Sequence, residues 1–177
     1  MSQETELGIV ISDGDWMNIW KMQQSTTSSH VWREHCWKNV IQFFINPKIT
    51  SKYMSRVQPC WRKCRDVNVN HLHVFWLCPK IAPFWDDVHT VIVKILGYSI
   101  PKTRWIPVEN IVGGLQEGIT KKWSWPNIPT REEWLQIVGI IFEMESLTYK
   151  LRTQEERCQD KWEKWAVFTS AAKNGQH

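Results

Sequence analysis

The sequence predicts a mostly α-helical protein with a small Cys/His loop between two of its helices. Two observations lead to this prediction. Apolar residues recur at three- and four-residue spacing in several segments, which is typical of the buried face of a helix. Three of the five cysteines and two histidines crowd into residues 60–78, between the first and second long segments. Thiolates and imidazoles gathered in so short a stretch are what a structural zinc site requires.

The N-terminal half is expected to begin irregularly and then to form two helices. Residues 1–28 are predicted to be irregular, with a strand or an apolar clip at residues 9–11. A helix is predicted over residues 30–44, and the Asn-Pro pair that follows stops it because proline disfavours the helical conformation in the preceding residue. A short helix is expected over residues 48–56, and a short extended piece over residues 72–77.

The C-terminal half is expected to hold two helices joined by a linker. An apolar stripe predicts a helix over residues 81–96, and Gly97 follows it where a C-cap glycine would lie. The capping box that runs from Thr130 to Glu133 starts a helix expected to reach about Lys164. The predicted divisions are an irregular segment (1–28), a helical Cys/His module (29–98), a Gly/Pro-rich linker (99–129), a C-terminal helical segment (130–170) and a disordered tail (171–177).

Charge is distributed unevenly along the chain. The formal net charge is +4, which by itself is a weak argument for a nucleic-acid partner. Residues 33–80 hold nine basic side chains and two acidic ones, a local balance of +7, whereas residues 130–165 hold eight acidic and six basic ones, a balance of −2. The positive part coincides with the Cys/His loop. It is either an ordinary solvated face or a surface that follows phosphates.

The candidate metal ligands are Cys60, Cys64, Cys78 and one histidine. Three residues separate Cys60 from Cys64, and four separate His73 from Cys78; both gaps occur in structural zinc sites. Spacing favours His73 over His71 as the fourth ligand, although either is geometrically feasible. The alternatives are that the thiols are simply buried in an aromatic cluster, or that the site has decayed and no longer binds metal.

The same loop contains the candidate nucleic-acid-binding residues. Arg62, Lys63 and Arg65 are predicted to contact phosphates, and Trp61 beside them is the best candidate for stacking on a base. The alternative for the tryptophans is core packing, which is the expectation for Trp85 on its apolar helix face. The predicted partner is RNA or single-stranded nucleic acid.

The sequence does not predict an enzyme. It has no glycine-rich phosphate loop and no Gly-x-Ser-x-Gly nucleophile turn, and no small-molecule substrate is expected. No apolar run is long enough to cross a membrane. The acidic, polar N-terminus does not resemble a secretory signal, and the odd number of cysteines favours reduced thiols, so an intracellular protein is expected. No basic cluster is strong enough to favour the nucleus over the cytoplasm.

Short motifs of aromatic, basic and cysteine residues follow one another from about residue 15 to residue 170. The most specific are Pro59-Cys-Trp-Arg-Lys-Cys64 and Leu72-His-Val-Phe-Trp-Leu-Cys-Pro-Lys-Ile81. Supporting motifs are Arg33-Glu34, Trp37-Lys38, Phe43-Phe44, Asn46-Pro47, Phe84-Trp85, Glu133-Trp134 and Trp162-Glu-Lys-Trp165. Together they resemble the region that follows the reverse transcriptase in LINE-type (non-LTR) retrotransposon proteins, of the kind abundant in fish genomes.

This resemblance implies a zinc-knuckle-like motif that helps to hold template RNA, with Cys60, Cys64, His73 and Cys78 as its ligands. Arg65 stands where many relatives have glycine, which strains the knuckle turn. Neither the Tyr-x-Asp-Asp polymerase signature nor an endonuclease region is present in this chain. The expected function is therefore a non-catalytic nucleic-acid-binding module of such a protein. The alternative is a decayed helical remnant that acts at most as a protein-interaction domain.

Overall fold

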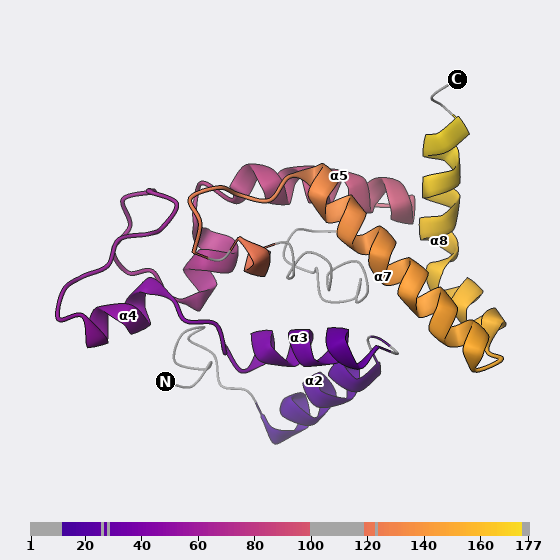
Figure 1. Ribbon diagram of the computed structural model, residues 1–177, viewed down its shortest axis with the longest axis horizontal. Helices are drawn as coiled ribbons and strands as arrows, with labels where there is room; N and C mark the ends of the chain where they lie inside the picture. The colour runs from indigo at the N-terminus through magenta and orange to yellow at the C-terminus, as the bar shows by residue number, and fades with distance from the viewer. Residues whose placement is uncertain (1–11, 26, 28, 100–118, 123, 175–177) are drawn as a thin grey trace.

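The computed structural model describes residues 12–25, 27, 29–99, 119–122 and 124–174, and Figure 1 shows how its helices are arranged. The elements, in chain order, are α2 (Asp13–Ser25), α3 (His30–Val40), α4 (Pro47–Tyr53), η1 (His73–Leu77), α5 (Ala82–Leu96), α7 (Arg131–Leu151) and α8 (Glu155–Asn174). Every regular element in these ranges is helical and the Cys/His cluster lies between helices, so the predicted fold class is confirmed. The strand predicted at residues 9–11 and residues 100–118 of the predicted linker lie outside the described part.

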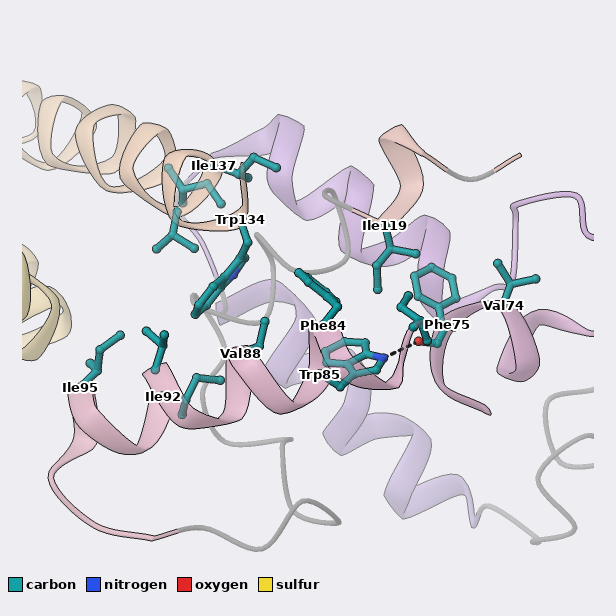
Figure 2. Packing of buried hydrophobic residues seen from close by; sticks show 14 of the residues in the cluster. Val74, Phe75, Phe84, Trp85, Val88, Ile92, Ile95, Ile119, Trp134 and Ile137 are labelled. Carbon is teal, nitrogen blue, oxygen red and sulfur yellow. Dashed lines mark hydrogen bonds between the residues drawn. The ribbon is translucent and has the colours of Figure 1, made fainter. Parts of the chain in front are cut away.

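Packing of α5 against α7 and α8 forms the hydrophobic core. The apolar stripe of α5 faces inward, and Figure 2 shows Phe84 and Val88 facing Trp134 of α7, whose side chain is completely buried. Trp162 and Trp165 of α8 belong to the same cluster. Burying one large apolar side chain contributes about 1.5–3 kcal/mol, so these aromatic residues account for much of the packing energy. The segments predicted separately as residues 29–98 and 130–170 share this core.

Capping residues set three helix ends, and those at Thr130 and Gly97 were predicted. Two helices end earlier than predicted, α3 at Val40 and not at residue 44, and α4 at Tyr53 and not at residue 56. Asn46 caps α4, since its Oδ1 accepts a hydrogen bond from the Ile49 amide at 3.1 Å. Thr130 and Glu133 form the predicted capping box at the start of α7, each side chain accepting a hydrogen bond from the other residue's amide. Gly97 ends α5 in a left-handed conformation with φ of 77°, which glycine adopts without strain.

Three expectations about local structure are wrong. Residues 13–25 are helical, not irregular, because Ser12 caps α2: its Oγ accepts a hydrogen bond from the Asp15 amide at 3.2 Å, and the Asp15 carboxylate accepts from Ser12. Residues 73–77 form η1, a π-helical turn, in place of an extended piece. The single helix expected to reach Lys164 is two helices, because Thr153, with φ of 53°, turns the chain between α7 and α8.

The tail also differs from expectation, since α8 continues to Asn174 and includes most of the segment predicted to be disordered. Residues 175–177 lie outside the described part. No helix among the described residues combines the length and apolar character needed to span a membrane.

A buried carboxylate connects the N-terminal part of the chain to the core. Glu145 of α7 has no exposed surface, and it accepts hydrogen bonds from Thr27 and from the Trp162 indole, the latter at 3.0 Å. The Lys161 ammonium lies 3.3 Å away. Burying a carboxylate is costly unless it is paired and hydrogen-bonded, and here its partners come from two separate parts of the chain, Thr27 near the N-terminus and α8.

We expect Glu145→Ala to destabilise the protein by about 3 kcal/mol, because the Trp162 N–H and Lys161 would lose their buried partner. The measurement is the free energy of unfolding in urea. Glu163→Ala, which removes an exposed carboxylate from α8, is the matched control and should change stability by less than about 0.5 kcal/mol. Equal losses in the two variants would contradict the bridging role of Glu145.

Candidate metal centre

The Cys/His loop is built from a tight turn and a π-helical turn that face each other. In the first turn, the Lys63 amide donates to the Cys60 carbonyl at 2.8 Å, and the Cys60 amide donates to the Asp66 carbonyl at 3.1 Å. In η1, the Cys78 amide donates to the His73 carbonyl at 2.9 Å. This bond joins residues five apart, as in a π-helix, and so places Cys78 one turn after His73. An α-helical bond joins residues only four apart, so an α-helical turn would not align these two residues in this way.

The structure brings the four predicted ligands together. One ligand atom from each of Cys60, Cys64, His73 and Cys78 lies within 4.8 Å of all the others. The sulfurs of Cys60 and Cys78 are 3.8 Å apart, and Cys64 Sγ is 3.4 Å from His73 Nε2. A tetrahedral ion with metal–sulfur bonds of about 2.3 Å and a metal–nitrogen bond of about 2.0 Å requires separations of roughly 3.8 and 3.5 Å. These two separations match a four-coordinate metal site, and the other ligand atoms stay within 4.8 Å of one another.

Asp66 orients the histidine ligand. Its Oδ2 lies 3.0 Å from His73 Nδ1, so that ring nitrogen carries the hydrogen and Nε2 is turned towards the thiols. Its other oxygen accepts from the Asn68 amide at 2.9 Å, which holds the carboxylate in place. Sequence reasoning missed this residue. The available signal was that Asp66 is one of only two acidic residues within the strongly basic segment.

Burial favours the uncharged forms of Cys60 and His73. Burial raises the pKa of the Cys60 thiol to about 12. Burial also lowers the pKa of His73, although Asp66 acts in the opposite direction. A neutral imidazole is the form that ligates metals, whereas each thiol must release its proton to the solvent as the ion binds.

The expectation that Arg62 contacts phosphates is corrected by its position. Its side chain is only 4% exposed, and Nη1 donates to the Val74 carbonyl at 2.7 Å. A divalent ion held by three thiolates and a neutral imidazole would carry a net charge of −1, which the buried guanidinium beside His73 would offset. Arg62 therefore links the loop to η1 and faces inward.

The remaining loop residues differ in exposure. Lys63 and Arg65 are exposed, as the nucleic-acid hypothesis requires, and Trp61 is half-buried. Trp76 stacks on Trp85, with ring centroids 4.0 Å apart, and Trp85 is a core residue as predicted.

His71, the alternative fourth ligand, does not join the cluster. Its ring lies against Phe75 with centroids 4.5 Å apart, and burial lowers its pKa to about 4. The cluster contains His73 and not His71, as the spacing of the residues favoured.

A scan against models of protein families finds none that matches the chain.

The turn contains a residue in an unfavourable conformation. Arg65 has φ of 70°, the left-handed region in which most side chains are strained and glycine is not. We expect Arg65→Gly to stabilise the protein by about 0.5–1 kcal/mol in urea unfolding at a fixed metal concentration. Arg56→Gly, which removes another exposed arginine from a position without positive φ, should not stabilise it. A loss of stability in Arg65→Gly would mean that its side chain matters more than its backbone strain.

Proposed function

We propose that this chain is a zinc-stabilised helical module that binds RNA or single-stranded nucleic acid, corresponding to the C-terminal region of a LINE-type retrotransposon reverse-transcriptase protein. The observation that carries the proposal is the convergence of four ligand atoms within 4.8 Å, directly beneath a turn that exposes Lys63 and Arg65. The motifs that resemble the retrotransposon proteins include this same turn.

Zinc fits the donor set best. Three thiolates and an imidazole are soft and borderline ligands, which favour zinc over magnesium or calcium. Because four protein side chains fill a tetrahedral shell, no coordination position is left for a substrate or a reactive water. Cys60 and Cys78 also belong to the hydrophobic core, so the ion would connect the loop to the core of α5. The proposed role of zinc is therefore structural.

Exposed basic residues in the loop of the cluster, and just before it in the chain, support a nucleic-acid partner. Lys52 and Arg56, at and just beyond the end of α4, are exposed together with Lys63 and Arg65. The nearest acid in the sequence, Asp66, faces His73. Cationic side chains on one loop region attract a phosphate backbone, and neutralising each phosphate releases counterions. Trp61 lies beside these residues in the chain and is only half-buried, which is compatible with stacking on a base.

The alternative function is that of a decayed, non-catalytic helical remnant acting at most as a protein-interaction domain. The left-handed conformations of Lys63 and Arg65 favour it, because a selected metal turn would be expected to place glycine at such a position. This alternative predicts that the chain binds neither zinc nor nucleic acid.

Zinc content distinguishes the nucleic-acid-binding module from the decayed remnant. We expect the reduced protein to retain a single zinc ion per chain, at the one cluster found among the described residues, and to lose it in Cys78→Ser. With free zinc about 1,000-fold above its Kd, chelation should cost about 4 kcal/mol of unfolding free energy. Cys158→Ser, which removes a buried thiol far from the cluster in the chain, is the control that keeps the metal. Metal-free wild-type protein would favour the remnant.

Nucleic-acid binding is tested with a double charge reversal, K63E/R65E. We expect the affinity for a labelled single-stranded RNA to fall and the slope of log K against log salt to decrease by about 1.4, since two phosphate contacts are lost. The measurement is fluorescence anisotropy over a series of salt concentrations, with zinc content checked in each sample. K94E/R157E reverses two exposed charges on α5 and α8 and should leave the slope unchanged. Equal slopes in both double variants would refute binding through the loop.

A further inference from the structure

Helix α7 has a second apolar face that the core does not use. Its buried residues, among them Trp134, Val138 and Ile141, face α5 and α8. Four more apolar side chains lie along another face of the same helix, with exposed fractions of 52% to 78%: Ile140, Met144, Leu147 and Leu151. Their spacing of four, three and four residues puts them on one line along the helix. We refer to these four residues as the α7 seam.

The α7 seam is complementary to itself when two copies run antiparallel. If a two-fold axis passes between Glu145 and Ser146, Ile140 meets the partner's Leu151, and Met144 meets the partner's Leu147. Each of these layers occurs twice, because a two-fold contact is reciprocal. All four apolar side chains of each copy are then covered, and none faces a polar residue.

Charges on the flank of the seam select the same register. Glu143 and Lys150 are exposed on the side of the seam away from the core, and neither side chain forms an ion pair with any described residue. Glu143 and Lys150 are seven residues apart and so occupy the same position of the heptad, beside the seam. In an antiparallel pair this position of one helix faces the same position of the other, so Glu143 meets the partner's Lys150, and this contact occurs twice. In a parallel pair, Glu143 would face the partner's Thr148, and no opposite charges within α7 would meet. Hydrophobic matching and charge matching therefore agree on one geometry.

We propose that the α7 seam is a homodimerisation surface, occupied by the α7 helix of a second copy of this chain in antiparallel orientation. The seam covers less than two heptads, so the contact is a short helix pair and not an extended coiled coil. Four apolar side chains per copy bury less than the roughly 1,200–2,000 Å² of a standard stable interface. The dimer is accordingly weak and dependent on concentration. It leaves the Cys/His loop exposed, because that loop lies at the opposite end of the molecule from the α7–α8 junction (Figure 1).

Charge exchange tests both the surface and its register. We expect sedimentation velocity over about a hundredfold range of concentration to show a monomer–dimer equilibrium for the wild-type protein. E143K and K150E each replace two attractive contacts with two repulsive ones, so each should weaken dimerisation about tenfold. An equimolar mixture of the two variants should recover the wild-type affinity, because the mixed dimer pairs Lys with Glu at both positions.

Two results would overturn the proposal. The first is a wild-type protein that stays monomeric at every concentration, which would leave the seam to another occupant. The second is a dimer whose affinity is unaffected by either charge reversal or is not recovered by mixing, which would place the contact on another face or in another register. Leu147→Asp should abolish the dimer, and circular dichroism of all variants reports whether α7 still folds.

Discussion

The hydrogen bond from the Trp85 indole to the Phe75 carbonyl is the contact on which the arrangement of this molecule depends. It measures 2.8 Å and joins the first turn of α5 to the π-helical turn η1 (Figure 2). Because Trp85 is fixed by the core and Phe75 lies between His73 and Cys78, the core packing sets where both ligands point. An indole N–H that is buried requires such a partner, so the bond also satisfies the polar end of a large apolar side chain.

The basic residues of the Cys/His loop are divided between its interior and its surface. Arg62 is turned inward and buried, where its charge would offset that of the proposed metal–thiolate centre. Lys63 and Arg65, its neighbours in the loop, are exposed. The positive residues of one short loop are thus divided between a structural task and a proposed binding task. The exposed apolar seam of α7 lies on another part of the molecule, so the two proposed surfaces do not compete.

Much of the site was predictable because metal ligation depends on residue type and spacing. Cys60, Cys64, His73 and Cys78 converge as their spacing indicated, and the capping residues Thr130 and Glu133 begin α7 as predicted. Asp66 was missed because the residue that orients a ligand is recognised only by where its carboxylate points. Arg62 was misjudged for a related reason, since a sequence records that an arginine is basic and not whether its side chain faces solvent.

The sequence by itself determined the helical class, the core stripe of α5 and the three cysteines of the cluster, with His73 favoured over His71 as the fourth member, because these follow from local periodicity, capping and donor chemistry. Tertiary structure decided which apolar residues are buried. Met144 and Leu151 share helical spacing with Ile137 and Ile141, yet only the latter two are covered, because α5 and α8 pack along one side of α7. It also decided that residues 73–77 close into a π-helical turn, since the Phe75 carbonyl within that turn accepts a hydrogen bond from the Trp85 indole of α5.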